Sequence, residues 1–143
     1  LHGFILLVYN CRMDTISTAS DKTILVIEDE HLLRKILLEK LALNGFKTIG
    51  AEDGEEGLKM ALEKKPDLVL LDILLPKMNG IEVLKRIRAS SEKDMPVFML
   101  TNSQPDDYIT TEVAELEPTY YLIKANLELE DLMNKIRETL NLT

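Results

Sequence analysis

The sequence predicts an α/β protein, a doubly wound five-stranded parallel sheet with helices on both faces. Short, continuous apolar runs alternate along the chain with longer segments whose apolar residues recur at helical spacing. Continuous rather than alternating apolar runs are typical of parallel strands buried on both faces. Short loops and right-handed crossovers between the strands then distribute the helices over the two faces.

Five segments are predicted to be strands. Four of them are uninterrupted apolar runs, and the second in chain order is weaker because polar residues interrupt it. The predicted strands cover residues 24–27, 46–51, 68–71, 97–100 and 120–123.

Five helices are expected, one after each strand. Asn44 and Gly45 predict the end of the first helix, and Asp53 is expected to cap the second, which ends before Pro66. Pro105 suits the first position of the fourth helix. The apolar stripes, in chain order, are Leu32, Leu33, Ile36, Leu37 and Leu41; Leu58, Ala61 and Leu62; Ile81, Leu84 and Ile87; Ile109, Val113 and Leu116; and Leu129, Leu132, Ile136 and Leu140.

Length and composition restrict the chain to one domain. Its 143 residues, 45% of them hydrophobic, are enough for a single core without a metal or disulfide staple. The only cysteine, Cys11, excludes an internal disulfide. Residues 21–143 are predicted to form the domain, and residues 1–20 a disordered or appended leader, since Met13 could serve as an initiator.

Charge and hydropathy argue against two function classes. With 17 basic and 25 acidic residues the net charge is −8, the opposite of the usual balance in a nucleic-acid-binding domain. The apolar run over residues 4–9 is too short to span a bilayer. A cytoplasmic protein with no membrane span and no direct DNA binding is expected.

Polar residues follow the predicted strands at the edge where parallel strands end. Glu28 and Asp29 follow the first strand, Asp72 the third, Thr101 the fourth and Lys124 the fifth. In an open parallel sheet this edge binds ligands. Any one of these residues alone would more often be a turn or helix cap, but their joint placement indicates a site.

The chemistry of these residues indicates a phosphoryl site. Clustered carboxylates repel unless a cation neutralises them, and oxygen ligands without His or Cys suit Mg²⁺. A metal, a lysine and a hydroxyl together offset the charge of a phosphoryl group. One of the carboxylates is then a candidate nucleophile that forms an aspartyl phosphate.

With these motifs the stretch over residues 23–140 resembles the receiver domain of two-component response regulators, of the stand-alone, single-domain type. Residues 28–29 are similar to that family's acidic metal-binding pair, and residues 71–80 to its phosphoacceptor loop. Residues 99–101 and 121–124 are similar to the segments that hold its switch threonine, switch aromatic and phosphate-binding lysine. The resemblance implies a flavodoxin-like receiver fold with strand order 2-1-3-4-5.

The resemblance also implies a role for each residue of the site. Asp72 would accept a phosphoryl group from a phosphohistidine of a sensor histidine kinase or a histidine phosphotransfer protein. Asp29, Asp72 and the backbone carbonyl of Leu74 would ligate Mg²⁺, or Mn²⁺, with Glu28 acting through a water molecule. Lys124 would pair with the carboxylate and then with the phosphoryl oxygens. The protein would be a regulatory phosphoacceptor that assists its own phosphorylation and dephosphorylation, not an enzyme.

The implied output is a change of packing. Thr101 would move toward the phosphoryl group and Tyr121 would turn into the vacated space, which would alter the face built from the fourth helix, fifth strand and fifth helix. A separate downstream protein is the expected partner of this face.

Several positions depart from the family pattern. Glu28 replaces the commoner Asp, and Asn102 follows Thr101 where a smaller residue is usual. Ala125 replaces the proline of a cis peptide bond, and since cis costs about 2.5–4 kcal/mol without proline, a trans bond and a shifted loop are predicted. The turn over residues 117–120 lacks the usual glycine and is expected to be rebuilt.

Three positions would tune the lifetime of the phosphoryl group. Leu74, Asn102 and Ser103 lie beside the predicted phosphoacceptor and switch residues. Leu74 cannot orient an attacking water by hydrogen bonding and Ser103 does so weakly, so a long-lived phosphoryl group is expected.

Two alternatives remain open. A flavodoxin-like carrier would need a hydroxyl- and glycine-rich phosphate loop, where this chain has acids at Glu28 and Asp29. A receiver-like module that binds proteins without being phosphorylated is compatible with Asn102 and Ala125. An aspartyl phosphatase would need a second Asp at Leu74, and no NTPase phosphate loop is present.

Overall fold

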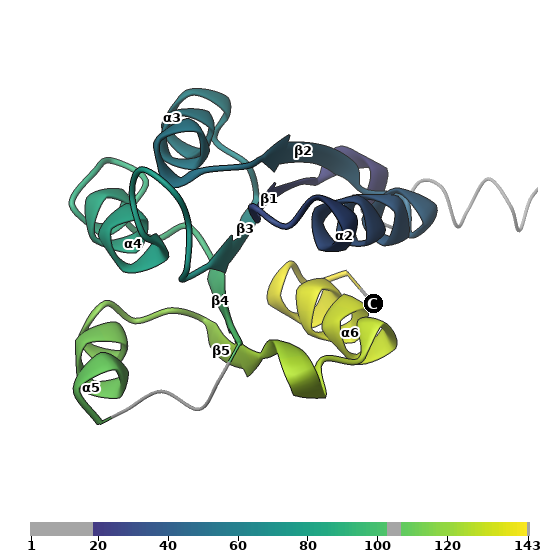
Figure 1. Ribbon diagram of the computed structural model, residues 1–143. Helices are drawn as coiled ribbons and strands as arrows, with labels where there is room; N and C mark the ends of the chain where they lie inside the picture. The colour runs from purple at the N-terminus through teal and green to yellow at the C-terminus, as the bar shows by residue number, and fades with distance from the viewer. Residues whose placement is uncertain (1–18, 103–106, 143) are drawn as a thin grey trace, which may run out of the picture.

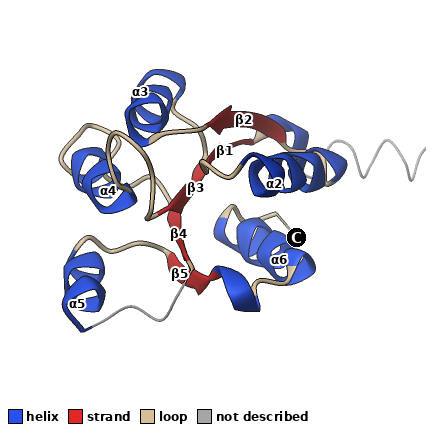
Figure 2. Ribbon diagram, in the orientation of Figure 1, coloured by secondary structure: helices blue, strands red, loops and turns tan. Residues whose placement is uncertain are grey.

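The computed structural model describes residues 19–102 and 107–142 of the chain (Figure 1). The expectations for the leader before residue 19, for Ser103 and for Pro105 lie outside the described residues, and the domain boundaries stay a prediction. All five predicted strands are present, and a helix follows each of them (Figure 2). The elements, with two 3₁₀ helices η1 and η2, are η1 Ala19–Asp21, β1 Thr23–Ile27, α2 His31–Leu43, β2 Lys47–Ala51, α3 Gly54–Lys64, β3 Leu68–Asp72, α4 Gly80–Arg88, β4 Val97–Thr101, α5 Asp107–Glu115, β5 Tyr120–Ile123, η2 Lys124–Asn126 and α6 Leu129–Thr139.

The strands form one parallel sheet in the order β2-β1-β3-β4-β5, which confirms the predicted fold class and strand order. The register aligns the strand ends: Ile27 lies opposite Leu71, and Leu71 lies opposite Met99. Every residue of β3 and β4 is buried, as their continuous apolar runs predict for central strands.

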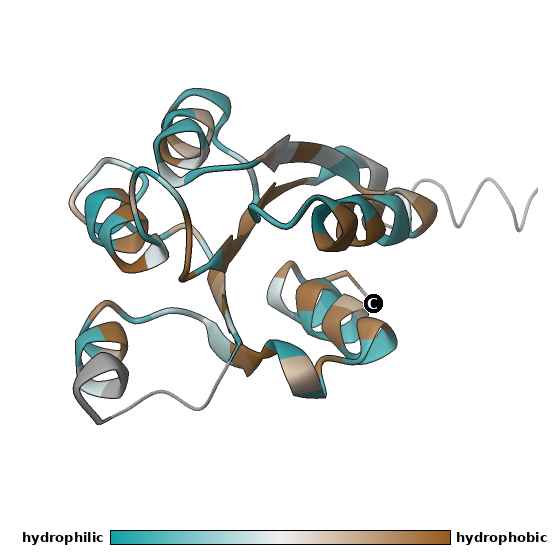
Figure 3. Ribbon diagram, in the orientation of Figure 1, coloured by the Kyte–Doolittle hydropathy of each residue, from teal (hydrophilic) through white to brown (hydrophobic). Residues whose placement is uncertain are grey.

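Helices cover both faces of the sheet (Figure 1). Helices α3, α4 and α5 lie on one side of the sheet and α2 and α6 on the other, and the described helices carry both hydrophobic and hydrophilic residues (Figure 3). Alternate strand residues therefore point into two separate cores. The first contains Leu25, Ile27, Val69, Leu71, Val97 and Met99, with Ala61, Val83, Ile87 and Val113 from the helices; the second contains Ile24, Val26, Leu68, Leu70, Phe98 and Leu100, with Leu37, Leu41, Leu132 and Ile136.

The predicted apolar stripe of α2 includes two residues that the structure leaves exposed. On α2 only Leu37 and Leu41 are fully buried, whereas Leu32 is 63% exposed and Ile36 is 39% exposed. At 100° per residue, Leu32 and Ile36 lie on the side of the helix opposite Leu37 and Leu41. A helix that packs on one face of a sheet buries only the side toward that sheet, so this prediction was wrong for Leu32 and Ile36.

The predicted helix ends are confirmed where the structure describes them. Asn44 is the C-terminal cap of α2, and Gly45 follows at φ 91°, a backbone conformation that glycine adopts without a Cβ clash. Asp53 caps α3, because its Oδ1 accepts a hydrogen bond of 2.8 Å from the Glu56 N–H.

The loop after β5 has the trans peptide bond that Ala125 in place of proline predicts. The described residues contain no cis peptide bond, so the Lys124–Ala125 bond is trans. The chain continues there into η2, and Leu127 N–H closes the turn by donating to the Lys124 carbonyl at 3.1 Å.

The turn before β5 lacks glycine, as the sequence shows, and Glu117 adopts φ 51° there, in the left-handed region. Its carbonyl accepts a hydrogen bond of 3.1 Å from Arg88 Nη2, and Arg88 Nε donates to the Leu116 carbonyl at 2.9 Å. Arg88 thus fastens the end of α5 to α4, although a non-glycine residue at positive φ is strained.

Glycine at position 117 should relieve that strain. We expect Glu117→Gly to raise the free energy of unfolding by about 0.5–1 kcal/mol, because the bonds from Arg88 reach the backbone and survive the change. The matched control is Glu115→Gly at the last residue of α5, which is not at positive φ, and this change should leave the free energy of unfolding unchanged or lower it. Urea denaturation of the three proteins measures both changes, and a destabilised Glu117→Gly protein would contradict the assignment of strain.

No helix in the described ranges has both the length and the apolar character needed to cross a membrane.

Candidate functional site

The polar residues predicted to meet do so at the carboxyl edge of the sheet. Glu28 and Asp29 directly follow β1, Asp72 ends β3, Thr101 ends β4 and Lys124 directly follows β5. The aligned strand ends place these positions side by side, although they are up to 96 residues apart in the sequence (124 minus 28). Three polar residues are buried there: Glu28 is 0% exposed, Asp72 2% and Thr101 8%.

Lys124 joins the two buried carboxylates. Its Nζ lies 2.6 Å from Glu28 Oε2 and 3.0 Å from Asp72 Oδ2, and its side chain is only 10% exposed. Since both acids are buried, the ammonium of Lys124 is the cation that offsets their charge among the described residues.

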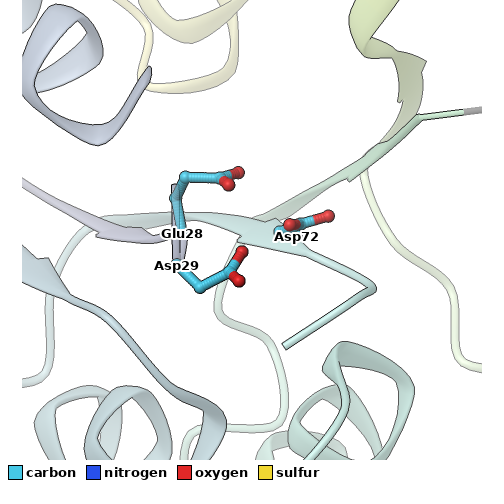
Figure 4. Close-up of side chains that lie close together, drawn as sticks. All are labelled: Glu28, Asp29 and Asp72. Carbon is cyan, nitrogen blue, oxygen red and sulfur yellow. The ribbon is translucent and has the colours of Figure 1, made fainter. Parts of the chain in front are cut away.

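Asp29 completes an acidic group with Glu28 and Asp72. One carboxylate oxygen from each lies within 4.8 Å of the others, and the three side chains approach the same space (Figure 4). Unlike the other two, Asp29 is exposed, so the group opens to solvent on its side.

Burial and neighbouring charges shift the pKa of Glu28 and of Lys124. Burial raises the pKa of Glu28, the negative charge of Asp72 raises it further, and Lys124 and the Glu30 N–H offset part of the rise. Burial lowers the pKa of Lys124, but the two neighbouring carboxylates outweigh burial and leave the pKa above its ordinary value. Lys124 therefore stays positively charged.

The loop after Asp72 is held by close backbone packing. Gly80 N–H donates to the Ile73 carbonyl at 2.8 Å, and a Cβ on Gly80 would lie 2.0 Å from the Asp72 carbonyl oxygen. Only glycine fits so close to another backbone. The Leu74 N–H lies 3.4 Å from Asp72 Oδ1, a long hydrogen bond that orients the carboxylate.

A second close approach connects this loop to α3. Gly54 N–H donates to the Pro76 carbonyl at 3.2 Å, and a Cβ on Gly54 would lie 1.8 Å from the Met78 carbonyl oxygen. Lys77, at φ 67°, forms an ion pair of 3.4 Å with Asp53 Oδ2. The sequence analysis missed these contacts, because nothing in the local sequence shows which backbone segments meet.

Of the two predicted switch residues, Thr101 ends β4 at the same edge, whereas Tyr121 is the second residue of β5 and lies opposite Met99. Tyr121 packs against the core on the α3–α4–α5 side, and its buried hydroxyl has no hydrogen-bond partner among the described residues. Leaving a buried polar group unsatisfied costs about 1–3 kcal/mol. Asn102 is exposed beside Thr101, and Leu74 is 65% exposed beside Asp72.

The donor set fits a hard divalent cation. Carboxylate oxygens from Glu28, Asp29 and Asp72 are the kind of ligand that Mg²⁺ and Mn²⁺ prefer, and the exposed side of Asp29 leaves access for water ligands. A buried carboxylate pair with a single ammonium still has negative charge to neutralise. The acidic group can therefore hold a metal ion.

Comparison with known proteins assigns the class. The sequence profile of the response regulator receiver domain family matches residues 24–137. The chain belongs to this family, whose members are regulatory phosphoacceptors of two-component signal transduction that pair with histidine kinases and bind Mg²⁺ at an acidic pocket.

Individual relatives agree with this class. The chain is 34% identical over 122 residues to the response regulator MprA of Mycolicibacterium vanbaalenii, which is 84% of this chain and 51% of MprA. It is 46% identical over 81 residues to the alkaline phosphatase synthesis transcriptional regulatory protein PhoP of Bacillus subtilis, 57% of this chain and 33% of PhoP. The chain thus spans about half or less of these relatives.

Solved structures show the same fold. A CheY-like response regulator receiver domain protein from Methanospirillum hungatei aligns with a TM-score of 0.78 at 26% identity, over 84% of this chain and 94% of that one. The chemotaxis protein CheY4 of Vibrio cholerae aligns with a TM-score of 0.74 at 25% identity, over 86% of this chain and 99% of that one.

Two expectations from the sequence are not supported by the comparisons. The stand-alone type is not confirmed, because the curated relatives are longer than the matched region. The absence of direct DNA binding is not supported either, because PhoP is named as a transcriptional regulatory protein and the chain matches only a third of it. The family match favours a receiver over a flavodoxin-like carrier.

Proposed function

We propose that this receiver is a phosphoacceptor switch in which Asp72 takes a phosphoryl group from a phosphohistidine. The donor is a sensor histidine kinase or a histidine phosphotransfer protein. The observation that carries the proposal is the buried Asp72 carboxylate, 3.0 Å from Lys124 Nζ and within reach of the acidic pair Glu28 and Asp29. A carboxylate held beside a cation and a metal-binding group can attack phosphorus without adding uncompensated charge.

The transfer exchanges one bond for another. An Asp72 carboxylate oxygen forms a bond to phosphorus while the bond from phosphorus to the imidazole nitrogen breaks. The electron pair of the broken bond stays on that nitrogen, which regains a proton, and Asp72 becomes an acyl phosphate. Lys124, already in contact with Asp72, then pairs with the phosphoryl oxygens.

Mg²⁺, or Mn²⁺, would neutralise charge on the phosphoryl oxygens when bound. Asp29, Asp72 and the backbone carbonyl of Leu74 would ligate it, and Glu28 would act through a water molecule. The support is the convergence of the three carboxylates within 4.8 Å at the open side of the site.

The switch would run through Thr101 and Tyr121. Thr101 ends β4 beside Asp72, and moving toward a phosphoryl group would give it a strong acceptor. The hydroxyl of Tyr121 is buried and has no hydrogen-bond partner among the described residues, which supports a second orientation of the ring in which the hydroxyl could find one. The face that would change is formed by α5, β5 and α6, and a separate downstream protein would bind there.

Phosphorylation is tested by incubating the chain with acetyl phosphate and Mg²⁺ and measuring the intact mass. One added phosphoryl group is expected, absent without Mg²⁺ and absent in Asp72→Asn. Labelling of Asp72→Asn to the wild-type level would overturn the assignment of Asp72. No labelling of the wild type by acetyl phosphate or by a phosphorylated histidine kinase would favour the alternative, a phosphorylation-independent binding module, with which Asn102 and Ala125 are compatible.

The phosphoryl group is expected to be long-lived. Leu74 is 65% exposed beside Asp72 and has no polar group with which to orient an attacking water. We expect Leu74→Asn to speed the loss of the label several-fold, whereas Leu74→Met should leave the rate within about twofold because its thioether is a weak acceptor. Decay of the label after removal of the phosphodonor measures the rate, and equal rates in Leu74→Asn and wild type would refute the role of Leu74.

A further inference from the structure

Arg34 ties the acidic loop to helix α2. Its Nη1 donates to the Glu28 carbonyl oxygen at 2.7 Å and lies 3.4 Å from the Asp29 carbonyl oxygen. One guanidinium thus contacts the backbone of both acidic residues that follow β1. No sequence pattern marks Arg34 as part of the site, because it lies in a helix and outside the acidic motif.

The guanidinium is itself held in place. Its Nη2 lies 3.2 Å from His31 Nδ1 and 3.7 Å from Glu52 Oε2, and only 14% of the Arg34 side chain is exposed. The aliphatic part crosses Gly50 of β2, since a Cβ on Gly50 would lie 3.6 Å from Arg34 Cδ. A planar donor group packed in this way loses little further freedom when it binds the loop.

The loop needs such support because regular pairing ends there. The Glu28 N–H still donates to the Ala51 carbonyl at 3.0 Å, but β1 ends at Ile27. Beyond that point the carboxylates of Glu28, Asp29 and Asp72 converge, and their mutual repulsion favours a wider loop. Arg34 opposes this widening from the backbone side. It contacts the carbonyl oxygens of Glu28 and Asp29, which leaves their carboxylates available for a cation.

We propose that Arg34 is a positioning residue that holds Glu28 and Asp29 in place for the divalent cation. The inference rests on the proposed metal-dependent function and adds a residue that does not touch the metal. Outer contacts that orient metal ligands typically change affinity by 10–100-fold when they are removed. Removing Arg34 should therefore weaken Mg²⁺ binding.

The direction of the change in Mg²⁺ affinity when Arg34 is removed distinguishes a positioning role from a simple effect of its charge. Arg34 is a positive charge near the site, and by Coulomb's law alone its removal would attract Mg²⁺ more strongly. Weaker binding after removal is therefore the opposite of the charge effect and is the result expected if Arg34 holds the ligands in place. Tighter or unchanged binding would mean that Arg34 acts merely as a charge, or not at all.

The test measures the Mg²⁺ dissociation constant of the whole chain by calorimetry, without a phosphodonor. We expect Arg34→Ala to raise the dissociation constant about tenfold. Arg34→Lys should bind more tightly than Arg34→Ala, because an ammonium can restore one of the two carbonyl contacts. The matched control is Arg86→Ala, whose exposed side chain pairs with Glu82 on α4 and should leave the constant within about twofold.

A second readout excludes a general loss of structure. With acetyl phosphate, Arg34→Ala should need more Mg²⁺ for half-maximal labelling of Asp72 but reach nearly the wild-type rate at saturating Mg²⁺. A maximal rate that stays low, or a dissociation constant equal to that of the wild type, overturns the role of Arg34. If wild-type Asp72 is labelled normally in that case, the proposed function stands and only this inference falls, whereas a wild type that does not bind Mg²⁺ overturns both.

Discussion

Replacing Lys124 with methionine is expected to lower the free energy of unfolding by about 3–5 kcal/mol in Mg²⁺-free buffer. The ammonium lies 2.6 Å from Glu28 and 3.0 Å from Asp72, and both carboxylates are almost fully buried. Methionine fills a similar volume but leaves the two acids without a cation. Thermal and urea unfolding of the metal-free protein measure the loss.

Mg²⁺ should stabilise Lys124→Met more than it stabilises the wild type, because the acids then have no competing cation. The matched control is Lys40→Met on α2, whose ion pair with Glu130 is exposed and should contribute less than about 1 kcal/mol. Similar small losses for Lys124→Met and Lys40→Met would show that the buried carboxylates do not depend on Lys124.

Gly80→Ala is expected to abolish labelling of Asp72 and to lower the free energy of unfolding by about 3 kcal/mol. The added Cβ would lie 2.0 Å from the Asp72 carbonyl oxygen and 2.9 Å from its carbonyl carbon. Backbone atoms cannot rotate away as a side chain can, so the peptide that carries the phosphoacceptor must shift. Intact-mass measurement with acetyl phosphate and Mg²⁺ reports the labelling, and urea unfolding reports the stability.

Gly50→Ala is the control for glycine substitution as such. Its Cβ would lie 3.0 Å from Leu38 Cδ1, the end of a flexible side chain, and should change stability by no more than about 1 kcal/mol while Asp72 is still labelled. Normal labelling of Gly80→Ala would mean that the loop after Asp72 tolerates a backbone shift, and that its position is not set by this contact.

Local patterns determined the elements of this protein. The continuous apolar runs predicted four of the five strands, a weaker interrupted run predicted β2, and Asn44, Gly45 and Asp53 marked helix ends that the structure confirms. These signals can be recognised from neighbouring residues alone. A strand buried on both faces has a continuous apolar run, and a helix cap is one residue of a suitable type at the helix end. The apolar pattern wrongly predicted burial of Leu32 and Ile36, because how many residues around a helix are buried depends on what packs against that helix.

The candidate site could also be predicted only in part from local patterns. The position of Glu28, Asp72 and Lys124 directly after their strands was enough to predict that they meet, because parallel strands share one carboxyl edge. The resemblance to receiver domains added the roles of Thr101 and Tyr121, which geometry alone does not test.

Only the tertiary structure decided the distances and the supporting contacts. The sequence does not show that Lys124 contacts both buried acids, that Arg34 crosses Gly50 to the acidic loop, or that Gly80 lies against the Asp72 carbonyl. Each of these contacts joins segments whose approach depends on how whole helices pack on the sheet. The sequence by itself was enough to place acidic, hydroxyl and lysine side chains at the strand ends. Packing between distant segments set the distances between these side chains and the pKa shifts of Glu28 and Lys124.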